Sequence, residues 1–152
     1  MKKWTRDIEI NAAIEQVWSY FNGSLEEMQR IMPQVVDQKP VKITEEVVGS
    51  VYRQKYKEGK RIEEYDVETL EYLNEPDYKK LKIGFTLANI FEITAFYEFK
   101  KVDENKTYLN YTTTNRPLKW FVKVFLIFAS DKMVVEFLER VKRVAEAETS
   151  KS

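Results

Sequence analysis

The chain has 152 residues and carries 25 basic and 25 acidic side chains, so its net charge is zero. This length predicts one domain with its own hydrophobic core. The sequence has no cysteine and no histidine, which excludes disulfides and thiolate chemistry and removes the commonest metal ligand and general base.

The first forty residues predict a strand followed by two short helices. Residues 3–10 alternate in polarity, which is typical of a half-buried strand. Asn11 is the expected N-cap of a helix over residues 12–21, whose apolar residues recur on one face. Residues 24–27 have the S-x-x-E spacing of a capping box, which predicts a second helix that ends before Pro33.

From residue 41 to residue 114 the apolar pattern changes to a period of two, which is typical of strands. Turn-forming residues separate the runs, and consecutive strands joined by short turns pair antiparallel. The expected strands are residues 41–47, 51–57, 61–73, 78–87, 90–101 and 107–114.

Residues 117–147 predict one long helix of roughly 45 Å, because Pro117 suits a first helical turn and no later Gly or Pro interrupts the pattern. Its first part, residues 120–129 (WFVKVFLIFA), is apolar almost all round, whereas residues 132–147 are amphipathic. The apolar part is about half the length that a transmembrane helix needs, so we expect no transmembrane segment. Residues 148–152 are expected to fray.

The element order β-α-α-β6-α predicts an α+β fold. Seven strands form a curved antiparallel sheet, and the terminal helix is the element long and apolar enough to cover its inner face. The first ten residues lack the apolar core of a signal peptide, so we expect a cytoplasmic protein. The charges are interspersed, so we expect no nucleic-acid partner.

After the opening strand, residues 11–21 (NAAIEQVWSYF) resemble a signature of the START-like (SRPBCC) superfamily, with Val17 and Trp18 at its Val-Trp positions. The topology resembles the helix-grip fold of START and Bet v 1 proteins over residues 1–152, as a single domain. This resemblance implies a deep cavity between the sheet and the final helix. Members use that cavity to bind lipids, sterols, polyketides or quinones, some act as cyclases, and some relatives activate chaperones. The family has no fixed catalytic set.

The inner face of the sheet is the expected place for a ligand. If Leu81, Ile83 and Phe85 face inward, strand alternation predicts which other residues join them. Apolar rings with a few hydroxyls are typical of ligand pockets, although these tyrosines could instead point to solvent at the sheet rim. Phenylalanines at helical spacing in residues 120–129 could close the pocket or form an ordinary core stripe. The candidate ligand-binding residues are Tyr52, Gln54, Tyr56, Tyr65, Phe85, Ile93, Tyr97, Tyr111, Phe121 and Phe125.

We therefore expect a binding protein for a small hydrophobic molecule, such as a lipid, fatty acid, polyketide or quinone, without catalysis, cofactor or metal. One alternative is a cyclase or dehydratase that uses a carboxylate or tyrosine as acid or base. Glu45 and Glu92 interrupt apolar surroundings, but such residues more often face water. The other alternative is an interaction module in which residues 120–129 contact a second copy in a homodimer, a membrane surface or a chaperone partner. We expect Lys79 and Lys80 on a solvated strand face.

Overall fold

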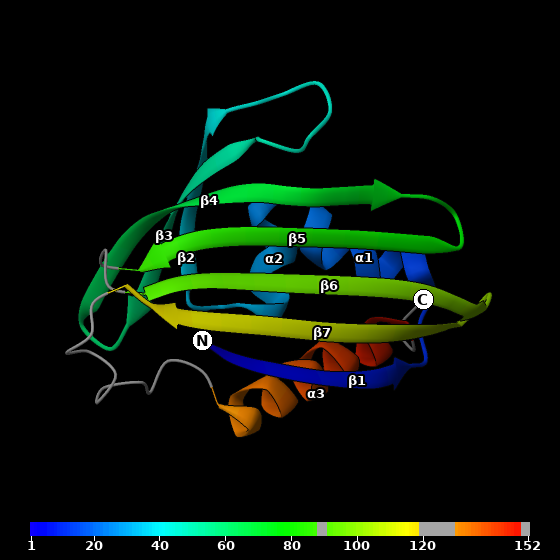
Figure 1. Cartoon of the computed structure of the whole chain (residues 1–152). Coiled ribbons are helices and arrows are strands. Elements are labelled where there is room, and N and C mark those ends of the chain that lie inside the picture. The colour runs from blue at the N-terminus through cyan, green and yellow to red at the C-terminus, as the bar shows by residue number, and fades with distance from the viewer. Residues whose placement is uncertain (88–90, 119–129, 150–152) are drawn as a thin grey trace.

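The computed structural model describes residues 1–87, 91–118 and 130–149. Within these ranges, seven antiparallel strands form one sheet in the order β1-β7-β6-β5-β4-β3-β2, and the three helices lie on one side of it (Figure 1). This arrangement confirms the expected helix-grip fold. The elements are β1 (Lys2–Ile10), α1 (Ile14–Asn22), α2 (Leu25–Ile31), β2 (Val35–Lys42), β3 (Val51–Glu58), β4 (Arg61–Asn74), β5 (Tyr78–Leu87), β6 (Phe91–Asp103), β7 (Lys106–Pro117) and α3 (Asp131–Thr149).

The two N-terminal helices meet at a tight corner. The Ser24 hydroxyl accepts the N–H of Glu27 at 3.3 Å, and the Glu27 carboxylate accepts the N–H of Ser24 at 3.2 Å. This confirms the capping box. A side chain at Gly23 would collide with the carbonyl oxygen of Ser19, so the corner requires glycine. The prediction of Asn11 as an N-cap was wrong, because α1 starts only at Ile14 and has no side-chain cap.

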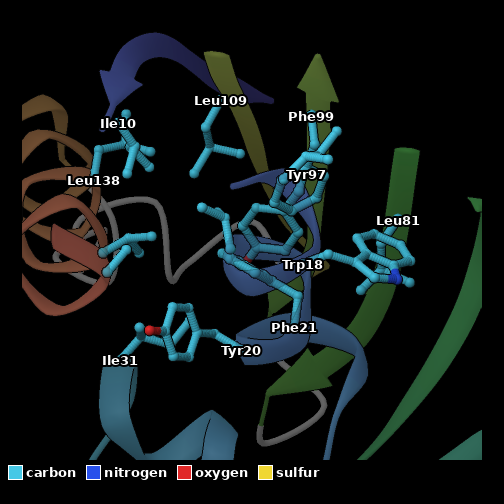
Figure 2. Packing of buried hydrophobic residues seen from close by; sticks show 14 of the residues in the cluster. Ile10, Trp18, Tyr20, Phe21, Ile31, Leu81, Tyr97, Phe99, Leu109 and Leu138 are labelled. Atoms are coloured by element: carbon cyan, nitrogen blue, oxygen red, sulfur yellow. The ribbon is translucent and has the colours of Figure 1, made fainter. Parts of the chain in front are cut away.

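The hydrophobic core fills the end of the sheet nearest the β6–β7 turn. Phe99 and Leu109 face each other across β6 and β7, and both are fully buried together with Leu138 of α3 (Figure 2). Trp18 and Phe21 of α1 pack edge-on against Phe99, with ring centroids 5.2 and 5.0 Å apart. Such aromatic contacts add to the stabilisation from burial. Helices α1 and α3 therefore close this end of the inner face.

Two expected boundaries were wrong. The strand expected at residues 41–47 lies earlier, at Val35–Lys42, and residues 43–50 form a loop in which Val47 has a φ of 71°. Pro40 is tolerated in β2 because β2 is an edge strand. Pro117 ends β7 and does not start the final helix. Pairing of β7 with β1 stops at Asn115, so the missing N–H of Pro117 removes no bond on that side.

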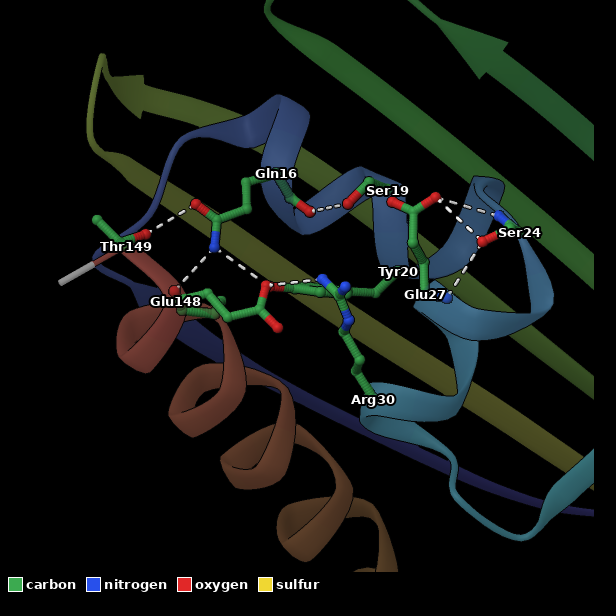
Figure 3. A network of polar contacts seen from close by, with 9 residues as sticks. Gln16, Ser19, Tyr20, Ser24, Glu27, Arg30, Glu148 and Thr149 are labelled. Carbon is green, nitrogen blue, oxygen red and sulfur yellow. Dashed lines mark hydrogen bonds and ion pairs between the residues drawn. The ribbon is translucent and has the colours of Figure 1, made fainter. Parts of the chain in front are cut away.

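The C-terminal end of α3 is tied to α1 and α2. The Tyr20 hydroxyl donates to the Glu148 carboxylate at 2.5 Å, which also pairs with Arg30 at 3.2 Å (Figure 3). Gln16 donates to the carbonyl of Ala145 at 2.9 Å and accepts from the Thr149 hydroxyl at 2.8 Å. The helix therefore continues through residues 148 and 149, where we expected fraying; residues 150–152 lie outside the described residues.

Lys79 is buried, which corrects the expectation of a solvated strand face. Its side chain is 1% exposed because it points to the same inner face of β5 as Leu81. Its ammonium donates to Asn74 Oδ1 at 2.5 Å and to the Glu75 carbonyl at 3.0 Å, and it pairs with Glu15 at 2.7 Å. This lysine therefore links the β4–β5 turn to the first turn of α1.

Candidate functional site

A pocket of about 300 Å³ lies between the inner face of the sheet and the α1–α2 corner. Each of the candidate ligand-binding residues that the structure describes contributes to its wall. Whether they bind a ligand stays a prediction. Phe121 and Phe125 lie outside the described residues, as do the rest of residues 119–129. The candidates in the wall are Tyr52, Gln54, Tyr56, Tyr65, Phe85, Ile93, Tyr97 and Tyr111.

Sequence reasoning missed the part of the wall that the sheet does not supply. The helix side of the pocket is covered by Phe21 of α1, Met28 of α2 and Met32, which directly follows α2. Phe21 was recognisable as part of an apolar helix face, but the pattern does not say that this face covers a pocket. Gln38 was missed because the strand that carries it was placed too late in the chain.

The roof of the pocket differs from the one that the family resemblance implies. Among the described residues, those of α3 are absent from the wall, and the roof is the α1–α2 corner. Phe137 of α3 instead packs against Tyr97 and Tyr111, with ring centroids 6.2 and 5.4 Å apart. This packing fills the space under the described part of α3 with side chains.

Two stacked aromatic pairs form flat surfaces in the wall. Tyr97 of β6 and Tyr111 of β7 are directly opposite each other, and their rings stack 4.8 Å apart at 20°. Tyr65 of β4 and Phe85 of β5 also stack, 4.8 Å apart at 22°. Aromatic pairs on neighbouring strands stabilise a sheet, and here they also give the pocket planar apolar faces.

A short chain of hydrogen bonds crosses three neighbouring strands on the same wall. Gln38 Nε2 of β2 donates to Gln54 Oε1 of β3 at 3.2 Å. Gln54 Nε2 in turn donates to the Tyr65 hydroxyl of β4 at 3.1 Å. The strand register places these three residues side by side. The pocket therefore has an ordered polar strip beside its aromatic surfaces.

Acid–base groups suited to neutral pH are missing from the described wall, which contains no Asp, Glu, Lys or Arg. Burial raises the pKa of Tyr65 to about 12, and it also raises the pKa of Tyr97 and Tyr111. These phenols stay protonated at neutral pH, whereas a general base works best with a pKa near the operating pH.

The carboxylates considered for catalysis lie away from this pocket. Glu92 is 46% exposed and pairs with Arg116 at 2.9 Å. Glu45 is exposed in the loop of residues 43–50. Neither lines the pocket, so neither is placed to act on a molecule inside it.

A second hollow, of about 880 Å³, lies on the outer face of the sheet. Its wall contains Glu64, Asp66 and Glu68, and Arg53 pairs with Asp66 at 2.9 Å. Within residues 1–87, 91–118 and 130–149, no three acidic side chains gather as metal ligands would. This charged surface suits water better than an apolar ligand, so the inner pocket is the candidate site.

Comparison with known proteins gives one sequence match. Residues 1–146 match the family described as polyketide cyclase / dehydrase and lipid transport. None of the curated proteins compared with the chain matches it. The helices in the described part of the chain lack the combination of length and apolarity that crossing a membrane requires.

Several solved structures share the fold at low sequence identity. The di-domain ARO/CYC BexL of the BE-7585A biosynthetic pathway is 13% identical, with a TM-score of 0.74 over 96% of this chain and 47% of BexL. The chain thus spans about half of that protein. Ginseng major latex-like protein 151 from Panax ginseng is 17% identical, with a TM-score of 0.67 over 97% of this chain and 96% of that protein. Norcoclaurine synthase from Thalictrum flavum, in complex with dopamine and hydroxybenzaldehyde, is 13% identical, with a TM-score of 0.62 over 94% of this chain and 85% of that protein.

Proposed function

The chain belongs to the polyketide cyclase/dehydrase and lipid transport family, and we propose that it binds a small hydrophobic molecule in the pocket between its sheet and the α1–α2 corner. The observation that carries the proposal is the wall itself, which combines stacked aromatic rings with a short polar strip. Ligand sites typically have mostly apolar walls with a few oriented polar groups.

Burial of apolar surface would supply the driving force for binding. A ligand that buries about 300 Å² of apolar surface gains roughly 7 kcal/mol at 25 cal/mol per Å², before the cost of association is subtracted. The fold can accommodate small aromatic molecules, since norcoclaurine synthase has this fold and is known in complex with dopamine and hydroxybenzaldehyde.

Binding is favoured over catalysis by the chemistry of the described wall. A cyclase or dehydratase needs an acid or base beside its substrate. The described wall offers only amides, hydroxyls and phenols, and burial raises the pKa of the phenols of Tyr65, Tyr97 and Tyr111. Catalysis would therefore require groups outside this wall.

The test is ligand-induced stabilisation, combined with native mass spectrometry of the complex. A ligand at about 100 times its Kd stabilises the folded state by about 2.7 kcal/mol, which raises Tm by roughly 5–10 °C for a domain of this size. Ala95→Leu places an isobutyl group in the pocket and should abolish the effect. Thr86→Leu places one on the outer hollow and should leave the effect intact. Loss of binding in Thr86→Leu and not in Ala95→Leu would overturn the proposal.

A further inference from the structure

The absence of charge in the described wall limits which ligands can enter. Among the pocket phenols with a shifted pKa, Tyr56 is the one that charged side chains affect. Burial raises its pKa most, Glu58 raises it further and Arg140 lowers it. Arg140 already donates to the carbonyl of Ile31 at 3.1 Å. An ionised ligand group would therefore meet no charged side chain in the described wall, and burial of an unpaired charge is far more costly than burial of a neutral polar group.

The polar strip ends in a hydroxyl whose proton is available. Tyr65 accepts a hydrogen bond from Gln54, which itself accepts from Gln38. A tyrosine hydroxyl has one proton to donate, and in the described part of the chain no acceptor receives that of Tyr65. The hydroxyl of Tyr97 donates to that of Tyr111. The hydroxyl of Tyr65 is thus ready to donate to a ligand oxygen inside the pocket.

The size and shape of the pocket suit a small planar molecule. Its volume of about 300 Å³ equals that of roughly ten water molecules at about 30 Å³ each. The stacked pair of Tyr65 and Phe85 places a planar surface directly beside the hydroxyl of Tyr65. The O–H of a phenol lies in the plane of its ring, so a flat molecule that meets the edge of Tyr65 can receive the proton, and the stacked rings of Tyr97 and Tyr111 offer it a planar surface in the same pocket.

We propose that the pocket selects an uncharged, planar ligand with a carbonyl-type oxygen that accepts a hydrogen bond from Tyr65. This inference rests on the proposed function and narrows it. Ketones, quinones and esters fit the description, whereas ionised fatty acids and protonated amines do not.

Three naphthalenes of nearly equal size separate charge from hydrogen bonding in a calorimetric titration at pH 7. 2-Acetylnaphthalene has a neutral carbonyl, 2-naphthoate has a carboxylate, and 2-isopropenylnaphthalene has no acceptor. The ketone should bind about a hundredfold or more tighter than the carboxylate. It should bind about five- to tenfold tighter than the alkene, which reflects one net hydrogen bond.

Matched variants test the role of the hydroxyl. Tyr65→Phe should remove the preference for the ketone over the alkene and leave the rejection of naphthoate in place. Tyr78→Phe is the control, because Tyr78 donates to Glu98 at 2.6 Å and does not line the pocket. Its affinities should match those of the unmodified protein, and Tm values show whether each variant is folded.

The outcomes separate the inference from the function on which it rests. If naphthoate binds as tightly as the ketone, or if Tyr65→Phe retains the preference for the ketone, the inference is wrong while hydrophobic binding stands. If none of the three compounds binds, both the proposed function and the inference are refuted.

Discussion

The buried ammonium of Lys79 offers a quantitative test of how the fold is held together. Asn74 Oδ1 accepts from it at 2.5 Å, beside the Glu75 carbonyl at 3.0 Å and Glu15 at 2.7 Å. Removing one acceptor leaves a buried charge with fewer partners, and a hydrogen bond to a charged group contributes about 1.5–3 kcal/mol. Asn74→Ala should therefore lower the free energy of unfolding by that amount. Tm should fall by about 3–12 °C.

A double-mutant cycle isolates this bond from other effects of the substitution. In a Lys79→Met background the buried charge is gone, so Asn74→Ala at the exposed end of β4 should cost less than about 0.5 kcal/mol. In a Lys80→Met background the full cost should remain, because Lys80 pairs with Glu71 instead. Urea unfolding followed by tryptophan fluorescence measures all the variants, since Trp18 lies 5.8 Å from the ammonium. Equal costs of Asn74→Ala in all backgrounds would refute the reasoning.

Three further predictions concern stability. Burial raises the pKa of Tyr65 to about 12, whereas an unfolded tyrosine titrates near 10. The folded state therefore holds this proton more tightly. The stability that this burial contributes is present below about pH 10 and should be lost as the pH rises towards 12. Urea titrations across this range should show a smaller loss for Tyr65→Phe, and an unchanged loss would contradict the assignment. Tyr20→Phe and Glu148→Ala should each cost about 1–2 kcal/mol, and in a double-mutant cycle the two costs should not add fully, because both variants lose the hydrogen bond between Tyr20 and Glu148. Val47 has a φ of 71°, which is strained for a residue with a side chain. Val47→Gly should therefore stabilise the protein by about 0.5–1 kcal/mol, measured by chemical denaturation. Val48→Gly, at a residue outside the positive-φ region, should destabilise the protein by a similar amount.

Much of the sheet could be predicted from the sequence, because alternation and turn residues act locally. The bounds of β5, Tyr78–Leu87, agree with the prediction, since a clear period of two is flanked by turn signals. Antiparallel pairing then extends the assignment to other strands, because the inward residues of β5 determine which residues of β6 lie opposite them. Ile93 and Tyr97 were placed on the inner face in this way, and both line the pocket.

Features that depend on tertiary contacts could not be predicted in this way. Residues 41–47 alternate like a strand, yet the segment that pairs with β3 is Val35–Lys42, which contains a proline and is largely exposed. Here pairing with a neighbour outweighed local pattern. A lysine is usually solvated, so the burial of Lys79 became evident only with the acceptors around it. Likewise, no local pattern shows that Met28 covers a pocket.

The most direct test of the central claim is to map where a ligand binds by methyl NMR, with 2-acetylnaphthalene as the probe. Binding in the inner pocket should change the shifts of the methyl groups of Ile83, Ile93 and Ala95, which line that pocket, and leave those of Val51 and Leu70, which line the outer hollow, unchanged. Changes confined to Val51 and Leu70, or no changes at a saturating concentration of the ketone, would contradict it.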